Sequence, residues 1–463
     1  MRKVIEKRVS PIFPKEYEIK PEGVPVITGE DYQNRIAALL KLAKGKYSHI
    51  VVYADREHFA NMEYLSGFDP RFEEALLVVT EGAKPTLVVG LEGEMYCTKI
   101  NFPVNVELFT TFGLAGQPRN QGKRLKEILQ NAGINKSAKV GLTGWKYYTA
   151  DDFADFEQSY DIPHYIVETI KELSGGNVSN ATDLFTDCEY GMRHNLDAKE
   201  IVLSEIANSK VSRGTFNVIK NLKAGMSEIE ASLLLQLDGD PLCTHPALSF
   251  GMPNVSYALG SPTYHKKLED GDVISVGASY RRSMIHRLCS FVDNEAQLPK
   301  GSMDSFYKPY FMSTVNWYET VGIGVRGGDV YKAAEEPLGS YKDFGVVLNP
   351  GHLIHTDEWS NAPLYQGSEE KLHSGMLVQC DYTVAKGSLY AHIEDGIAIA
   401  DAALRDEIAR IAPESMARIN ARRTFMIDTL GIKIKDEILP LSDIQGMMFI
   451  YAKDPSIVLA MEA

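Results

Sequence analysis

The sequence predicts an α/β domain in its N-terminal half and an α+β domain in its C-terminal half. With 463 residues, the chain is longer than one ordinary hydrophobic core accommodates. In the first half, short apolar runs bounded by turn residues follow an amphipathic stretch, as in layered α/β domains. In the second half, a helical stretch over 197–222 precedes several runs typical of strands.

Four segments are expected along the chain. Residues 1–30 are rich in proline and charge, which indicates an extended N-terminal arm. The α/β domain is expected over 31–180 and the second domain over 190–405, with a C-terminal extension over 406–463. The boundary is placed near 172–190, because Ser174 to Thr182 is a run of small and polar residues typical of linkers.

Apolar spacing assigns the elements of the first domain. From Tyr32 onward, Ile36, Leu39, Leu40 and Leu42 recur at helical spacing and predict a helix. Short apolar runs then predict strands over 49–53, 75–79 and 87–90, with one more over 139–145.

The second domain begins with helices and continues with strands. Ser227 and Glu230 form a capping-box pattern that opens a second helix after 197–222. Runs over 273–277, 375–384 and 392–400 are typical of strands.

Composition excludes several classes of function. The net charge is −14 and no basic run is present, so nucleic acid and anionic membranes are poor candidate partners. The five cysteines are scattered and show no CxxC spacing, which favours reduced thiols in a cytoplasmic protein. Neither a secretory signal nor an apolar run of about 20 residues is present, so no membrane span is expected.

Titratable side chains gather on the last two predicted strands and in one segment before them. Asp381 lies on the first strand, and His392 and Glu394 share a face of the second. The segment 351–359 adds two histidines and further polar groups. Such groups on rigid strands suit a hydrolytic metal site, although a histidine beside a glycine is more often an ordinary loop or core residue, so that chance clustering is the commoner explanation of this pattern alone.

Several segments, in the same order, resemble the pita-bread hydrolases of the creatinase/prolidase/aminopeptidase P superfamily. The resemblance covers roughly residues 32–400 and implies a pita-bread fold for the second domain. The matching segments are 63–68 (the YLTGF segment), Arg193 with Lys199 and Glu200, 271–280 (the strand GDxVxxDxG), Gly351 with His352, Gly375 with Met376 and Asp381, and Ile393 with Glu394 and Asp395.

The resemblance implies an altered dinuclear metal site. Gly277 stands where the family has its first aspartate ligand, so one of the two metals loses a main anionic ligand. The second aspartate falls on Leu288 or, with a turn shorter by two residues, on His286. The family's histidine falls on His352. Its two glutamates fall on Asp381 and Glu394.

Three interpretations stay open. In the first, His286, His352, Asp381 and Glu394 hold a single divalent transition metal such as Zn, Mn, Fe or Co. In the second there is no metal: His352 or His286 is the general base, and the carboxylates bind a cationic substrate or orient the imidazole. In the third, the remaining groups form a buried hydrogen-bond cluster without catalysis.

Further site residues are expected nearby. His352, Glu394 and His355 are the candidate catalytic residues, His355 because the family has a second histidine beyond its GH. The candidate substrate-binding residues are Trp359 as a stacking face, Asp357, Arg282 as a carboxylate ligand, and His392, where the family often has arginine.

The resemblance implies hydrolysis of an amide or other C–N bond in a small molecule or short peptide, with a Xaa-Pro dipeptide as the default substrate. It also implies a homodimer, in which the N-terminal domain of one subunit lies near its neighbour's active site. The missing ligand at Gly277 keeps creatinase-like metal-free chemistry as an alternative.

Overall fold

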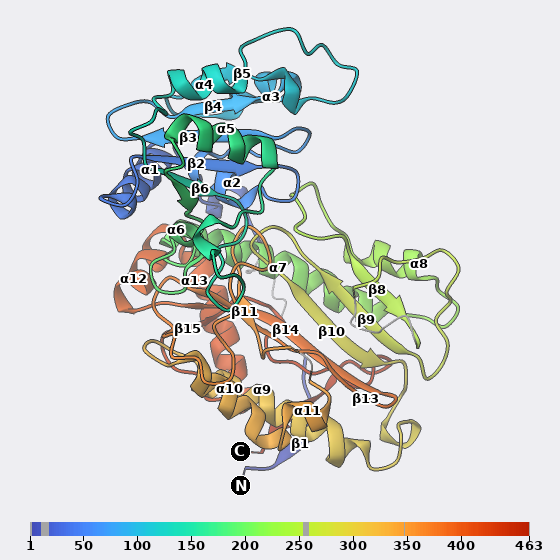
Figure 1. The fold of residues 1–463 in the computed structure, drawn as a ribbon. Coiled ribbons are helices and arrows are strands. Elements are labelled where there is room, and N and C mark those ends of the chain that lie inside the picture. The colour runs from blue at the N-terminus through green and yellow to red at the C-terminus, as the bar shows by residue number, and fades with distance from the viewer. Residues whose placement is uncertain (1, 11–17, 253–258, 347, 463) are drawn as a thin grey trace. The chain divides into compact units, whose positions relative to one another are not determined.

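The computed structural model describes residues 2–10, 18–252, 259–346 and 348–462 (Figure 1). The chain divides into two compact units, Val26–Arg193 and Met1–Pro25 with His194–Ala463. The first unit extends past the expected linker, because Val178–Asn180 forms its strand β7. The start of the expected N-terminal arm belongs to the other unit.

The first unit is built on a mixed sheet with strand order β5-β4-β3-β2-β6-β7. The central strands are buried along almost their whole length, which explains their unbroken apolar runs. The strands are β2 (His49–Ala54), β3 (Ala75–Thr80), β4 (Thr86–Val89), β5 (Asn105–Leu108), β6 (Val140–Thr143) and β7; the helices are α1 (Gly29–Ala43), α2 (Ala60–Ser66), α3 (Leu91–Tyr96), α4 (Leu125–Asn131), α5 (His164–Ser174) and α6 (Asp183–Thr186).

Helices complete the core of this unit. α1 begins at a capping box made by Thr28 and Asp31. α5 buries Ile166 and Ile170 against the sheet and ends at Gly175, whose φ of 66° is left-handed. The expected helix from Tyr32 and the expected strands therefore form one layered α/β unit.

The second unit is built on a curved sheet with the order β11-β12-β14-β10-β9-β8, and β13 and β15 also pair with β14. All of these pairs are antiparallel. The long strand β14 therefore lies at the centre. The strands are β8 (Ala247–Phe250), β9 (Val273–Ala278), β10 (Ile285–Ser290), β11 (His352–Leu353), β12 (Leu377–Asp381), β13 (Val384–Lys386), β14 (Leu389–Ile399) and β15 (Ile438–Pro440).

The helix α7 (Ala198–Asn221) runs along this sheet against β9 and β10 (Figure 1). A buried ion network joins it to α13, because Glu205 on α7 pairs with Arg418 and Arg422 on α13. The remaining helices of the unit are α8 (Glu228–Ser232), α9 (Lys308–Thr320), α10 (Gly327–Glu335), α11 (Tyr341–Phe344), α12 (Ala402–Ile411) and α13 (Pro413–Thr424).

The two ends of the chain meet within the second unit. Strand β1 (Val4–Arg8) pairs antiparallel with β16 (Ile457–Met461). β15 of the expected C-terminal extension joins the main sheet through β14. The segment after residue 405 is therefore an integral part of this unit.

The predicted fold class is confirmed: an α/β N-terminal unit accompanies an α+β unit. None of the helices in the described parts of the chain combines the length and apolar character that crossing a bilayer requires.

Candidate functional site

Strand register gathers polar side chains on one face of the second unit's sheet. Directly opposite residues of antiparallel strands project to the same face. On β10, His286 lies opposite Gly277 of β9 and opposite Glu394 of β14. On β12, Asp381 lies opposite the same Glu394 from the other side. The register therefore places His286 and Asp381 on either side of Glu394, whereas Leu288 lies opposite His392, two residues before Glu394.

His352 enters this face from the start of β11. It pairs with Gln379, two residues before Asp381 on β12. Its Nδ1 lies 3.1 Å from the carbonyl oxygen of Leu353, and a carbonyl only accepts, so Nδ1 carries a hydrogen. Its Nε2 lies 3.5 Å from Asp381 Oδ2 and 3.9 Å from Glu394 Oε1. The second ring nitrogen thus faces both carboxylates.

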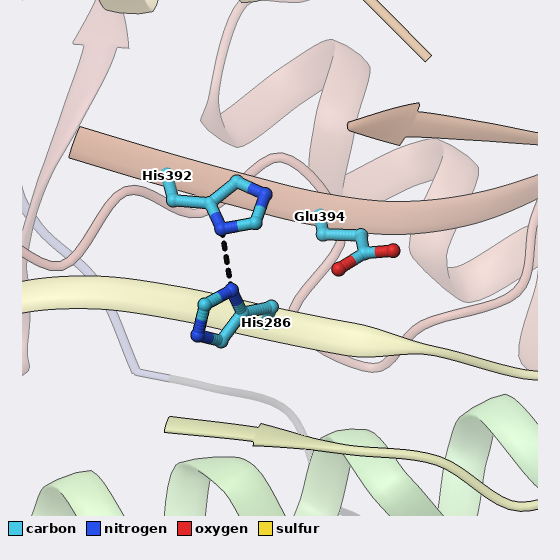
Figure 2. Close-up of side chains that lie close together, drawn as sticks. All are labelled: His286, His392 and Glu394. Carbon is cyan, nitrogen blue, oxygen red and sulfur yellow. Dashed lines mark hydrogen bonds between the residues drawn. The ribbon is translucent and has the colours of Figure 1, made fainter. Parts of the chain in front are cut away.

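A chain of hydrogen bonds crosses the sheet beside this histidine. Ser275 Oγ lies 2.7 Å from His286 Nε2, and the Nδ1 atoms of His286 and His392 are hydrogen-bonded to each other (Figure 2). His392 Nε2 lies 2.6 Å from Asp381 Oδ1. The two rings meet edge to face, with centroids 4.4 Å apart. Each ring nitrogen of the pair therefore has a hydrogen-bond partner.

Three buried polar atoms of the site make no hydrogen bond among the described residues. They are His352 Nε2, Glu358 Oε2 and Glu394 Oε1. The three side chains are 6%, 4% and 2% exposed, and their ligand atoms lie within 4.8 Å of one another. Buried donors and acceptors are nearly always paired, so this triad is exceptional.

The carboxyl groups of the site have opposite pKa shifts. Burial would raise the pKa of Asp381, but the nearby imidazole of His352 and the hydrogen bond to His392 outweigh it and hold that pKa below its usual value. Burial and the charge of Asp381 raise the pKa of Glu394 well above its usual value. Burial likewise raises the pKa of Glu358 to about 7. One carboxylate is thus firmly ionised beside two that hold protons easily.

The pKa values of His286 and His352 are also shifted in opposite directions. Burial, helped by the neighbouring His392, lowers the pKa of His286 well below its usual value. Burial would also lower the pKa of His352, but the negative charge of the neighbouring Asp381 carboxylate outweighs it and raises that pKa. His286 is therefore neutral near pH 7, whereas His352 protonates readily when no cation is present.

The glycine at 277 is matched to the histidine opposite it. A Cβ built on Gly277 would lie 2.7 Å from His286 Cδ2 and 3.3 Å from Met284 Cε. Real Cβ atoms do not approach that closely, so the imidazole leaves no room for a side chain at 277. The ring of His286 lies in the space that an aspartate at this position would enter.

Other predicted site residues occupy a neighbouring cluster. His355 is fully buried, and its Nε2 lies 3.1 Å from Glu200 Oε2. Arg282, which has a left-handed φ of 72°, donates from Nε to the same oxygen at 2.8 Å. Trp359 is 49% exposed. The structure thus brings His355 and Arg282 together on Glu200; their predicted roles, and that of Asp357, stay predictions.

Two side chains of the site escaped prediction. Glu358 lies in the polar segment 351–359, but motif comparison drew attention to His352 and His355, which precede it. Ser275 lies two residues before Gly277 on β9 and so shares its face. Counting titratable residues in the loop would have included Glu358; only the β9–β10 register shows that Ser275 reaches His286.

The triad of His352, Glu358 and Glu394 fits one divalent transition metal. One imidazole and two carboxylates are competent donors for Zn, Fe, Mn or Co. Two ligands bound at about 2.1 Å with a tetrahedral angle lie about 3.4 Å apart. The observed 3.9 Å between His352 Nε2 and Glu394 Oε1 is close to that spacing. Small side-chain shifts would complete the coordination.

No protein-family model matches this sequence, and neither does any curated protein. Solved structures do match. They include the Xaa-Pro dipeptidase from Bacillus anthracis, at a TM-score of 0.60 and 15% identity, over 79% of this chain and 94% of that one. The prolidase from Pyrococcus horikoshii matches at 0.60 and 17%, over 79% and 95%. The dipeptidase PepE from Mycobacterium ulcerans matches at 0.61 and 18%, over 81% and 95%.

The fold is therefore that of the two-domain pita-bread proteins. More specifically, it is the fold of the solved Xaa-Pro dipeptidase and prolidase structures, which agrees with the pita-bread fold that the sequence resemblance implied. At these identities the likeness establishes the fold, and the chemistry depends on the residues that this chain presents.

Proposed function

We propose that this chain is a metal-dependent hydrolase that cleaves an amide or other C–N bond in a small substrate. One observation carries the proposal: His352, Glu358 and Glu394 bring ligand atoms close together at one point. Each of the three side chains has a buried polar atom there that makes no hydrogen bond among the described residues. Leaving such groups unpaired costs about 1–3 kcal/mol each. A bound cation would offset that cost. The names of the structural neighbours agree with a peptidase-like activity.

The chain's own residues prepare this site. The carbonyl of Leu353 holds the hydrogen on His352 Nδ1, so the lone pair of the neutral ring is on Nε2. His392 holds Asp381 by one oxygen, and the other oxygen places negative charge beside His352. A divalent ion at the triad would polarise a substrate carbonyl and make water a stronger nucleophile at neutral pH.

The charge of the site favours a substrate with a cationic end. Asp381, whose pKa is held low, lies beside the carboxyl groups of Glu394 and Glu358, so the site carries negative charge. The N-terminal ammonium group of a short peptide meets that requirement, and a Xaa-Pro dipeptide is the first substrate to test. Trp359, half exposed, offers a face for a proline ring.

Elemental analysis of full-length protein purified without added metal tests this proposal. We expect close to stoichiometric transition metal, together with turnover of a dipeptide panel that chelation abolishes and metal restores. His352→Ala should lose both metal and turnover, whereas His265→Ala, at an exposed position of the same unit, should keep both. A chain that remains free of metal at saturating Zn²⁺ would reject the proposal.

A second candidate function uses the same residues without metal. Glu358, with a pKa of about 7, would act as general base, and the protonated His352–Asp381 pair would act as acid. The two candidates differ in one measurement: turnover that resists chelation, by protein shown to be metal-free, supports acid–base chemistry. Absence of turnover with and without metal would support a non-catalytic protein.

A further inference from the structure

A second set of donor atoms lies beside the triad of His352, Glu358 and Glu394. His286, His392 and Glu394 each offer a ligand atom, and these atoms lie within 4.8 Å of one another. The three side chains are 2%, 5% and 2% exposed. Figure 2 shows the two imidazoles, from β10 and β14, facing each other with the carboxylate of Glu394 alongside. Glu394 is therefore common to both sets.

Both rings are held in the manner of metal-binding imidazoles. A histidine that binds metal through one nitrogen usually gives the hydrogen on the other nitrogen to a carboxylate or another oxygen. His392 Nε2 contacts Asp381 Oδ1 at 2.6 Å, and His286 Nε2 contacts Ser275 Oγ at 2.7 Å. The nitrogen that remains on each ring is Nδ1, and the two Nδ1 atoms converge.

The series of hydrogen bonds from Ser275 through His286 and His392 to Asp381 holds the same number of protons with and without an ion. Without one, Ser275 donates to His286 Nε2, His286 Nδ1 donates to His392 Nδ1, and His392 Nε2 donates to Asp381. With an ion, His286 shifts its hydrogen from Nδ1 to Nε2 and donates to Ser275 Oγ. Both Nδ1 lone pairs are then free, and neither imidazole gains or loses a net proton.

We propose that His286, His392 and Glu394 bind a second divalent metal ion, so that Glu394 lies between two ions. This inference rests on the proposed function, because the second ion shares Glu394 with the first. It replaces the expectation that Gly277 leaves only one ion. The missing carboxylate at 277 is compensated by His286, whose ring needs the space that a glycine leaves.

The donor types set the preference of this second position. Two neutral imidazoles and one carboxylate suit Zn, Co, Fe or Ni better than Mn or Mg, which prefer oxygen ligands. The set of His352, Glu358 and Glu394 has one imidazole and two carboxylates. Co²⁺ is a suitable probe, because its visible absorption reports the number and symmetry of its ligands.

The test is a titration of the metal-free, full-length chain with Co²⁺, followed by visible absorption and by elemental analysis after dialysis. We expect two ions per chain for the unsubstituted protein and one for His286→Asn or His392→Asn. Glu358→Gln should also bind one, through the other position. His265→Ala is the matched control and should bind two. Far-ultraviolet circular dichroism and thermal melting establish that each variant folds.

The outcomes separate this inference from the proposed function. If the unsubstituted chain binds only one ion, and that ion survives His286→Asn but is lost in His352→Ala, the second position is overturned and the first stays intact. Two ions that persist in both the His286→Asn and His392→Asn chains also overturn it. No bound ion at saturating Co²⁺ overturns both proposals. Two ions reduced to one by either substitution on the imidazole pair, with an altered absorption spectrum, support the inference.

Discussion

Gly277 and His286 are directly opposite each other on β9 and β10, and the imidazole fills the space beside the glycine. A Cβ at 277 would lie 2.7 Å from His286 Cδ2. The two residues therefore depend on each other: the loss of the side chain at 277 and the presence of a ring at 286 form a single structural feature. This relationship is accessible to mutagenesis without any knowledge of the substrate.

Gly277→Ala should destabilise the protein by about 1–3 kcal/mol, because overpacking forces a buried ring out of its position. Combining it with His286→Ala should recover part of that loss, as expected for residues in contact. Urea denaturation of the two single variants and the double variant measures the coupling. Gly239→Ala, where an added Cβ meets nothing within 4 Å, is the control and should change stability by under about 0.5 kcal/mol. Equal effects at 239 and 277 would contradict the fit described here.

Glu358→Gln should weaken binding of Zn²⁺ at the first position by at least about 100-fold, because it removes a charged ligand from a buried triad. The substitution keeps the shape of the side chain, so the fold should be preserved. Competition with a chelator dye of known affinity gives the measurement. Glu369→Gln, at an exposed position, should leave affinity unchanged. Undiminished affinity in the Glu358 variant would remove this residue from the ligand set.

Binding of metal at this triad should weaken as the pH falls. The pKa of Glu358 is about 7, and that of Glu394 is raised further by burial and by Asp381. Metal and proton compete for these oxygens, so affinity should fall about tenfold per pH unit for each proton displaced below pH 7. Calorimetry at pH 6, 7 and 8 measures the slope, and Glu358→Gln should reduce it. A flat profile over this range would show that these carboxyls are already ionised in the metal-free protein.

The sequence predicted the fold well, because order and spacing carry that information. Weak motifs in the right order led to the pita-bread fold, and the apolar runs located strands such as β2 and β9. His286, His352, Asp381 and Glu394 were also recognised as neighbours. The homodimer and the cytoplasmic location stay predictions.

The contacts between side chains within the site could not be predicted from the sequence, because they depend on strand register and on side-chain direction. Counting residues left positions 286 and 288 as alternatives; only the pairing of β10 with β9 and β14 distinguishes them. The contact between His286 and His392 joins residues 106 apart in the chain. Glu358 reaches the site from a loop whose path no periodicity describes.

The strands of the site are held together on their other face by a buried ion pair. Arg287 and Asp395 alternate with His286 and Glu394 along β10 and β14, so they project to the opposite face. Arg287 Nη2 donates to Asp395 Oδ2 at 2.7 Å, and both side chains are fully buried. The guanidinium also donates to four backbone carbonyls, those of His286, Glu394, Ile444 and Met447. One side chain thus ties both site strands to the C-terminal segment.

Arg287→Lys should therefore destabilise the chain by about 3–5 kcal/mol, although it keeps the charge, because an ammonium group cannot replace the guanidinium fork across five acceptors. Metal affinity should fall with it, since His286 and Glu394 lose the bonds that fix their backbone. Urea denaturation and metal titration measure the two effects. Arg326→Lys alters the exposed pair with Asp329 and should cost under about 1 kcal/mol. If Arg287→Lys is as mild as that control, the site strands do not depend on this contact.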